Sequence, residues 1–450
     1  MSMFTWEVVD PAPGEAVGPR QRLSWGRTVG LGAQHVVAMF GATFVFPVVM
    51  GLDPNLAIMF SGICTIGFLI ACSNKVPSYL GTSASFVASV AAIRAQGGNS
   101  ADVTGAIMVA GLVLAAIGFL IHVSGSEVVH KVLPPAVTGA VVMLIGFNLA
   151  PVVAGVYWPQ DQWVALLSAT FVVCATVMLP GFWGRISIFL GLVFGYVISW
   201  LADVFFGDIS SVLPTSDGQA VEHARVSWSG VSSAHWFGFP SGTLPDGVSV
   251  VHGPSVSLTF VLLVLPGVIA LIAENTGHVK AVAEMTGEDL DGYLGRAISA
   301  DGVATAFASA FGGSPTTTYA ENIGVMSATK VYSTAAYYVA GVVAILLGLC
   351  PKFGAVVSAT PGGVLGGITI VLYGMIGLVG AKIWVENGVD FGDPVNLVGL
   401  AAGLVAGIGG VTLQITDDFA LSGIALGTIM VIGYFHLVSW RRKAGSTGPL

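Results

Sequence analysis

The sequence predicts an all-α polytopic membrane protein of about 14 transmembrane segments, arranged as two inverted repeats of seven helices. The first observation is composition: of 450 residues, 54% are hydrophobic and 9% are charged, with a mean hydropathy of +0.86. The second is length, because about 20 apolar residues cross a bilayer and the chain has room for roughly 14 or 15 such spans. This composition, with a net charge of −8, excludes a nucleic-acid-binding protein, a secreted disulfide scaffold and a disordered protein.

The third observation is that the apolar runs form two sets of seven on either side of a polar break. The first set comprises residues 28–50, 55–73, 77–95, 103–125, 134–156, 162–180 and 186–206. The second set comprises residues 255–278, 297–312, 314–329, 331–350, 356–381, 395–412 and 419–439. Because each set has an odd number of spans, the second repeat should be inverted relative to the first.

The third segment of each set is unusual. Residues 77–95 and 314–329 both begin with a polar half rich in Thr, Ser, Gly and Pro, so we expect short extended stretches in segments 3 and 10. Non-helical backbone at membrane depth survives only where protein or a cavity satisfies its hydrogen bonds. Matching interrupted segments in the two halves are therefore typical of an inverted-repeat transporter, with its binding site at these segments.

Basic residues set the expected orientation. With a cytoplasmic N-terminus, only Arg94, Arg225 and Lys352 of the 16 Lys and Arg residues fall on the outer side. The remainder fall on the inner side: Arg20, Arg22, Arg27, Lys75, Lys131, Arg185, Lys280, Arg296, Lys330, Lys382, Arg441, Arg442 and Lys443. The positive-inside rule thus predicts that both termini are cytoplasmic. No cleaved signal peptide is expected, and the break at 207–254 should be an external linker.

Few ionisable residues lie within the apolar segments. Because burial of such a residue in hydrocarbon is costly, each of them is a candidate for a functional role. Glu274 and His278 are spaced i,i+4, so they share a helix face and can touch. Desolvation favours a neutral carboxylic acid, and a histidine can pass a proton near pH 7. A structural ion pair or a frayed helix end is the alternative interpretation of this pair.

Glu321 is the second acid of interest. Thr318 and Glu321 fit a T-x-x-E capping box that would open a half-helix near mid-membrane, with free backbone N–H groups facing a substrate. Glu321 could also simply cap its own helix. The corresponding element of the first repeat has no acid, and there Ala84 offers only its backbone N–H.

Other polar and sulfur-containing residues remain open to two interpretations. Gln34, His35, Asn148 and Asp301 could form helix–helix hydrogen bonds or belong to the site. The cysteines, which are Cys64, Cys72, Cys174 and Cys350, form no CxxC pair and are expected to be reduced packing residues. No metal-ligand cluster, nucleophile motif or phosphate-binding loop is found, so we expect neither a metal site nor catalytic residues nor an enzyme.

Two carboxylates and backbone N–H donors around one cavity suit a planar, uncharged ring with alternating N–H and C=O groups. Two glutamates would repel an anion unless they were protonated. A sugar would require more side-chain amides and aromatic stacking. The residues alone therefore favour a heterocyclic base without identifying it.

Several sequence blocks resemble the nucleobase–ascorbate transporter family. Glu321 followed by Asn322-Ile323-Gly324, four residues and Thr329-Lys330 is similar to the family signature. Further similar blocks are Gln34-His35 with Ala38-Met39-Phe40-Gly41-Ala42-Thr43, Tyr79-Leu80-Gly81, and Glu274-Asn275-Thr276-Gly277-His278. The resemblance runs from about residue 25 to 440, and the bacterial uracil and pyrimidine permeases are the most similar branch.

The resemblance implies a domain organisation and an environment. It implies a core domain from residues 28–130 and 255–350, and a gate domain from residues 131–206 and 351–440, with tails at 1–27 and 441–450. It also implies a homodimer joined mainly through the gates, multi-pass in a bacterial cytoplasmic membrane. The implied activity is proton-coupled uptake of uracil or a related pyrimidine, with no cofactor and the proton as coupling ion.

The resemblance also implies residue roles. Glu274 and Glu321 would hold the base, the backbone at Ala84 and Ala320 would complete the polar contacts, and His278 would share the proton route with Glu274. His35 and Tyr373 fall at positions that the family places near the site. Uracil permeases can have Phe at position 84 and Gly at position 320, so the two alanines leave the substrate range open. A purine permease for xanthine or uric acid is an alternative, as is an anion transporter or channel of the same fold.

Overall fold

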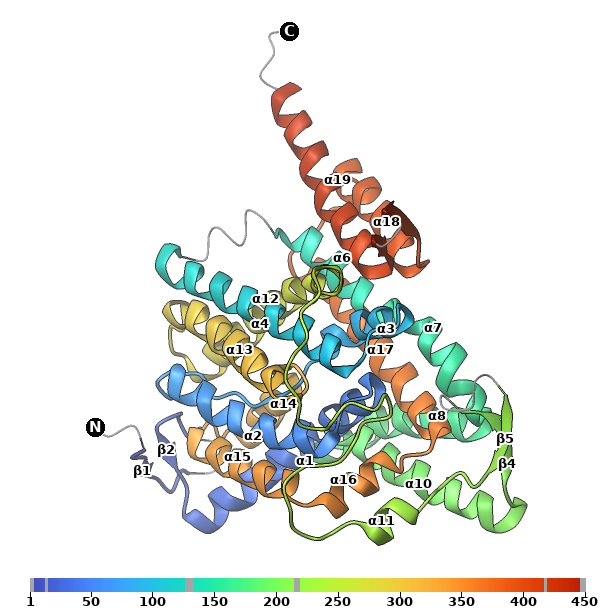
Figure 1. The fold of residues 1–450 in the computed structure, drawn as a ribbon. Helices are drawn as coiled ribbons and strands as arrows, with labels where there is room; N and C mark the ends of the chain where they lie inside the picture. The colour runs from blue at the N-terminus through green and yellow to red at the C-terminus, as the bar shows by residue number, and fades with distance from the viewer. Residues whose placement is uncertain (1–3, 13–14, 126–132, 214–218, 417–418, 446–450) are drawn as a thin grey trace.

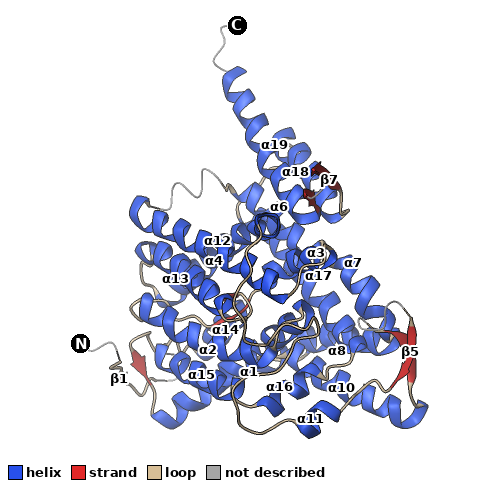
Figure 2. Cartoon of the chain, viewed as in Figure 1, coloured by secondary structure: helices blue, strands red, loops and turns tan. Residues whose placement is uncertain are grey.

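The structure is a computed structural model that describes residues 4–12, 15–125, 133–213, 219–416 and 419–445. Lys131 and the expected domain boundary at residues 130–131 lie outside the described residues. Helices make up most of the described chain, and strands are confined to short stretches (Figure 2).

The first half of the chain contains the elements expected for the first repeat. They are β1 Glu7–Val8, β2 Gln21–Arg22, α1 Trp25–Met50, α2 Pro54–Ala71, β3 Leu80–Thr82, the 3₁₀ helix η1 Ala84–Phe86, α3 Val87–Ala95, α4 Ser100–Ser124, α6 Pro135–Phe147, α7 Ala150–Val152, the π-helix η2 Val153–Tyr157, the 3₁₀ helix η3 Trp158–Gln160, α8 Gln162–Met178, α9 Phe182–Arg185 and α10 Ser187–Phe206. The linker that follows carries the antiparallel pair β4 Ile209–Val212 and β5 Ala220–His223, and the short helix α11 Ser229–Ser233.

The second half repeats the pattern. Its elements are α12 Leu258–Thr286, α13 Asp291–Ala310, β6 Thr316–Thr318, α14 Ala320–Thr329, α15 Thr334–Gly348, α16 Pro351–Ser358, α17 Gly362–Glu386, α18 Pro394–Ile408, β7 Thr412–Thr416, β8 Phe419–Ser422 and α19 Gly423–Gly445. Segments 3 and 10 each consist of a short strand followed by a short helix, which confirms the extended stretches expected there.

Three boundaries differ from the sequence prediction. The apolar run 134–156 is not one regular helix, because it changes after Phe147 to the short helix α7 and the π-helix η2. The run 356–381 is divided by Pro361, since α16 ends at Ser358 and α17 begins at Gly362. Helix α19 continues to Gly445, so the residues expected as a tail from 441 extend the last helix.

Eight helices among the described residues are long and apolar enough to cross a membrane, and the bent pair α15–α16, with an angle of 81°, would make nine. Shorter apolar helices add residues 84–95, 162–178 and 394–408. The chain is thus a multi-pass membrane protein, while the number of 14 crossings remains a prediction.

The helices pack in two groups (Figure 1). Helices α1, α2, α4, α12, α13 and α15 pack mainly on one another, and we call them the α13 group. Helices α6, α8, α10, α17, α18 and α19 also pack mainly on one another, and they form the α17 group. The groups meet where α12 contacts α6 and α19, and where α1 contacts α10.

Glycines allow the closest helix contact of the α13 group, between α4 and α13. A Cβ atom added to Gly118 would lie 2.3 Å from the backbone N of Ser299, and one added to Gly302 would lie 2.3 Å from the backbone N of Ala115. Since real Cβ atoms do not approach backbone atoms so closely, a side chain at either position would push the helices apart.

The linker between the repeats is attached to both groups of helices. At its start, the Arg225 guanidinium donates to Asp161 at 2.7 Å and to Asp203 at 3.0 Å, next to α8 and on α10. In its middle, Gly238 N donates to Leu349 O and Lys352 N donates to His235 O.

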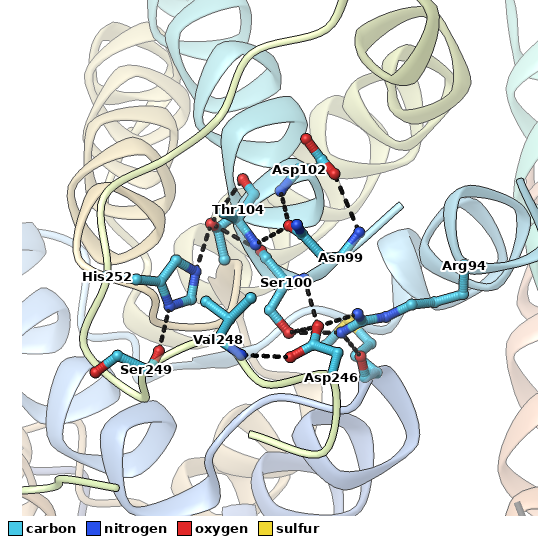
Figure 3. A network of polar contacts seen from close by, with 11 residues as sticks. Arg94, Asn99, Ser100, Asp102, Thr104, Asp246, Val248, Ser249 and His252 are labelled. Carbon is cyan, nitrogen blue, oxygen red and sulfur yellow. Dashed lines mark hydrogen bonds and ion pairs between the residues drawn. The ribbon is translucent and has the colours of Figure 1, made fainter. Parts of the chain in front are cut away.

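At its end, the linker is held by α3 and α4 of the α13 group (Figure 3). Asp246 pairs with Arg94 and accepts from the backbone N and the hydroxyl of Ser100, at 2.6 and 2.7 Å. Further along, His252 Nε2 bonds to Thr104 Oγ1 at 3.0 Å. The described part of the predicted linker has little regular structure. Side-chain contacts hold it against the helices near both of its ends.

Candidate functional site

The two interrupted segments cross at the centre of the site. Strands β3 and β6 pair antiparallel, with Leu80 opposite Thr318, Gly81 opposite Thr317 and Thr82 opposite Thr316. All six residues are buried, so this two-stranded ladder satisfies backbone groups inside the protein, as irregular backbone in a membrane protein requires.

Gly81 is required by close packing at this crossing. A Cβ atom at Gly81 would lie 2.5 Å from the Tyr319 ring and 2.6 Å from Thr43 Oγ1. Tyr319 is fixed there because its hydroxyl donates to Thr82 O at 2.7 Å and accepts from Thr43 Oγ1 at 3.2 Å.

Each strand leads into the N-terminus of a short helix. After β3, helix η1 begins at Ala84, and after β6, helix α14 begins at Ala320. The first N–H groups of a helix have no acceptor within the helix and carry its positive dipole end. Ala84 is half-buried and Ala320 is exposed, although Ser83 and Tyr319 just before them are buried. Both helix starts therefore keep accessible surface beside a buried crossing.

Glu274 and His278 on α12 both contact β6. Thr317 Oγ1 donates to Glu274 Oε2 at 3.3 Å, and Thr318 Oγ1 bonds to His278 Nδ1 at 2.7 Å. Within the described residues, no ion pair joins Glu274 to His278. Instead of contacting each other, Glu274 and His278 bond to neighbouring threonines of the strand, and Thr318 also donates to Asn275 Oδ1 at 3.4 Å.

Glu321 lies half-buried in the first turn of α14, which packs against α12, the helix that carries Glu274. The two acids therefore lie on neighbouring elements, one on a long helix and one on a half-helix. The predicted capping box is wrong, since the N-cap of α14 is Tyr319 and makes no side-chain capping bond. Thr318 lies one residue before the N-cap, and its hydroxyl bonds to His278 Nδ1 at 2.7 Å.

Asp301 on α13 contacts the residue that follows Glu274 on α12. It is fully buried, and its Oδ2 accepts from Asn275 Nδ2 at 2.7 Å, directly beside Glu274. Its other oxygen, Oδ1, has no hydrogen-bond partner among the described residues. On the same helix, Thr305 Oγ1 donates to Thr316 O at 2.9 Å and accepts from Thr316 N at 3.1 Å. Asp301 and Thr305 thus connect α13 to α12 and to β6.

His35 on α1 holds the Asn residue of the motif in α14. Asn322 Nδ2 donates to His35 O at 3.0 Å and lies 3.1 Å from His35 Nδ1, and both residues are buried. The His35 ring also packs on Tyr337 of α15, with ring centroids 4.2 Å apart. His35 therefore contacts the residue next to Glu321, without a bond to either acid among the described residues.

Tyr373 and Asn148 are separate from these contacts. Tyr373 on α17 is buried, its ring stacks on Phe46 of α1 at 6.5 Å, and its hydroxyl has no hydrogen-bond partner among the described residues. Asn148 donates to Gly407 O at 2.6 Å and so links α6 to α18 within the α17 group. Gln34 is half-buried on α1.

The structure thus brings together Glu274, Glu321, His278, Ala84 and Ala320 with Asp301, but no hydrogen bond ties Tyr373 to them.

Sequence reasoning missed the residues that orient these side chains. Thr317 belongs to a Thr-rich stretch that predicted only extended backbone, Thr318 was expected to cap a helix, and Asn275 was noted only as part of a sequence block. No group of three or more His, Cys, Asp or Glu residues in the described part of the chain could hold a metal ion, and the cysteines there are free.

Half-helices from two inverted repeats that meet through a paired strand, with acids beside them, define an inverted-repeat membrane transporter. Solved membrane proteins share this fold over more than 90% of the chain. The transmembrane domain of a cyanobacterium bicarbonate transporter, BicA, has a TM-score of 0.54 at 14% identity, and the match covers 91% of this chain and 96% of that domain. Murine Slc26a9, an anion transporter in the inward-facing state, has a TM-score of 0.64 at 12% identity, covering 94% of this chain and 70% of Slc26a9.

Sequence comparison identifies the family. A family profile described as a permease family, which covers nucleobase–ascorbate transporters, matches residues 26–416. The chain is 41% identical to the Escherichia coli protein named "Putative pyrimidine permease RutG", over 92% of this chain and 90% of that one. It is 34% identical to the uracil permease of Bacillus caldolyticus, over 91% and 92% of the two chains. The chain belongs to the nucleobase–ascorbate transporter family, and it is a transporter rather than an enzyme.

Proposed function

We propose that this protein takes up uracil or a closely related pyrimidine base together with protons, by alternating access. The observation that carries the proposal is that Glu274 accepts from Thr317 of β6 at 3.3 Å, while β6 leads directly into α14, which has Glu321 in its first turn. Carboxylates accept hydrogen bonds from ring N–H groups, and free backbone N–H groups donate to ring C=O groups. The names of the relatives at 34–41% identity support a pyrimidine as the base.

In this proposal Glu274 and Glu321 accept from the N–H groups of the base, and the backbone N–H groups at Ala84 and Ala320 donate to its carbonyl oxygens. Protonation cancels carboxylate charge before the site changes sides, because a neutral acid costs far less than a carboxylate in a dry site. Thr317 contacts Glu274, and His278 lies one turn further along α12, so in this proposal Thr317 holds Glu274 in position and His278 passes a proton. His35 acts by positioning α14 through Asn322.

The moving parts in this proposal are the two groups of helices. The α13 group, with β3, β6 and the half-helices, acts as the core domain that carries the base, and the α17 group acts as the gate. Their mainly internal packing supports this division. Two copies joined through their gates in a bacterial cytoplasmic membrane, with both termini inside, complete the proposal.

Competition between bases tests the choice of substrate. In membrane vesicles that contain the protein, an excess of unlabelled uracil should abolish uptake of labelled uracil, and xanthine or uric acid should leave it unchanged. Inhibition by the two purines at the same concentrations as uracil would instead support the purine permease alternative.

A further inference from the structure

The surface of the α13 group contains a groove that plays no part in the proposed transport site. It lies between α2, α4 and α13, with a volume of about 550 Å³, and it includes the exposed apolar side chains Phe119, Val303 and Phe307. On α13 it extends from Arg296 to Phe307, which is roughly 16 Å of helix at 1.5 Å per residue. It is therefore long, narrow and apolar over most of its length.

One end of the groove is basic. Arg296 lies near the start of α13, and His122 lies in the last turn of α4. Arg296 is half-buried, its guanidinium sits 5.6 Å from the centre of the Tyr293 ring, and it forms no ion pair or hydrogen bond with any described residue. A basic side chain at the membrane–water interface can bind a lipid phosphate, and the described part of the chain supplies no carboxylate partner for Arg296.

We propose that this groove binds an anionic phospholipid, with the phosphate on Arg296 and His122 and one acyl chain along Phe119, Val303 and Phe307. A basic pocket between helices at the cytoplasmic side, continued by an apolar channel, matches the two parts of such a lipid. The assignment of this end to the cytoplasmic leaflet rests on the orientation proposed above. Because the groove is formed by α2, α4 and α13, the bound lipid packs against the surface of the core domain.

Gly67 gives a way to block the groove without disturbing the fold. It lies on the groove side of α2, it is exposed, and a Cβ atom added there meets nothing within 4 Å. The variant Gly67→Leu therefore places a side chain in the path of the acyl chain. Gly433→Leu on α19 is the matched control, because Gly433 is also exposed and open and lies outside the groove.

Native mass spectrometry of the detergent-purified full chain tests the proposal, with phosphatidylglycerol and phosphatidylcholine of the same acyl chains as probes. The wild type should retain phosphatidylglycerol more tightly than phosphatidylcholine. Arg296→Gln should weaken phosphatidylglycerol binding about ten-fold, since a charge-assisted contact is lost. Lys382→Gln, at an exposed basic residue outside the groove, should leave binding unchanged. Gly67→Leu should weaken binding of both lipids, and Gly433→Leu should not.

Equal retention of the two lipids by the wild type would overturn the proposal, as would unchanged phosphatidylglycerol binding in both Arg296→Gln and Gly67→Leu. A cross-link from position 303 to a second copy of the chain would also overturn it, because a protein would then cover the groove. These readouts measure lipid binding and not uptake, so their outcome is independent of the proposed substrate.

Discussion

At the scale of single residues, the site depends on hydroxyl groups that hold the charged and titratable side chains in place. Thr317 donates to Glu274, and Thr318 bonds to His278. A buried polar atom without a hydrogen-bond partner costs about 1–3 kcal/mol. The side chains of Glu274 and His278 are therefore favoured in the positions where they can bond to the two threonines. Of two consecutive threonines, Thr317 thus contacts the acid of α12 and Thr318 contacts the histidine of the same helix.

Replacing Thr318 tests this positioning. Thr318→Val keeps the shape of the side chain but leaves His278 Nδ1 without its partner, so we expect uracil uptake to fall about ten-fold and its pH profile to change. Thr318→Ser retains the hydroxyl and should behave like the wild type. Uptake measured from pH 5 to pH 8 compares the three proteins. A valine variant with the wild-type rate and pH profile would show that the contact is not needed.

The sequence singles out the two acids of the proposed site, but not the side chains that contact them. Glu274 and Glu321 stand out because ionisable residues are rare in apolar segments. Thr317 and Asn275 do not, since threonine and asparagine also form ordinary helix–helix hydrogen bonds. The interpretation of Thr318 as a capping residue failed because a local motif cannot show that a histidine 40 residues earlier takes the same hydroxyl.

At the scale of helices, the α4–α13 contact supports the site, because α13 holds Asn275 and Thr316 through Asp301 and Thr305. Replacing Gly302 by Ala would put a Cβ atom 2.3 Å from the backbone of Ala115, and overpacking of this kind costs about 1–3 kcal/mol. We expect a clearly lower melting temperature in detergent. Gly292→Ala is the control on the same helix, because nothing lies within 4 Å of its new Cβ atom. Equal melting temperatures of the two variants would contradict the close contact.

The attachment of the linker to α3 and α4 should depend on pH. Partial burial alone would raise the pKa of Asp246, but hydrogen bonds from Ser100 and Arg94 outweigh it and lower the pKa to about 2. A carboxylate whose pKa is lowered by folding stabilises the folded state above its unfolded pKa of 3.8, and this contribution is lost as the pH falls towards 2.

Asp246→Asn should therefore lower the melting temperature at pH 7 and flatten its decline between about pH 4 and pH 2. Asp208→Asn is the control, because Asp208 is exposed in the same linker. Melting curves of the three proteins at pH 7, 4 and 3 measure the effect. If the Asp246→Asn protein lost as much stability on acidification as the wild type, the lowered pKa would be wrong.

The sequence predicted most of the helices but only some of their interruptions. The two strand–helix segments were found because Pro, Gly, Ser and Thr gather in them. The change from α6 to the π-helix η2 was not predicted, because Asn148 and Pro151 are isolated in an otherwise mainly apolar run and form no comparable cluster. The attachment of the linker at Asp246 could not be predicted either, since its partner Arg94 lies 152 residues away in the sequence.

At the scale of the whole molecule, the linker joins the two groups of helices from the side that we propose to be external. It begins on the α17 group at Asp161 and Asp203, and it ends on α3 and on α4 of the α13 group. The α17 group supplies none of the acids at the site, whereas the α13 group and its half-helices supply all of them. A relative movement of the two groups would therefore carry the proposed binding site as one unit.

The central claim is tested most directly by uracil accumulation in proteoliposomes. An inward proton gradient is imposed, and uracil is initially present only outside. The wild-type protein should concentrate uracil above its external level and stop when a proton ionophore is added. Glu274→Gln should lose this accumulation, Glu321→Ala should lose uracil binding, and Glu284→Gln, at an exposed acid on the same helix as Glu274, should match the wild type. Accumulation that persists in both Glu274→Gln and Glu321→Ala, or that ignores the ionophore, would contradict the account.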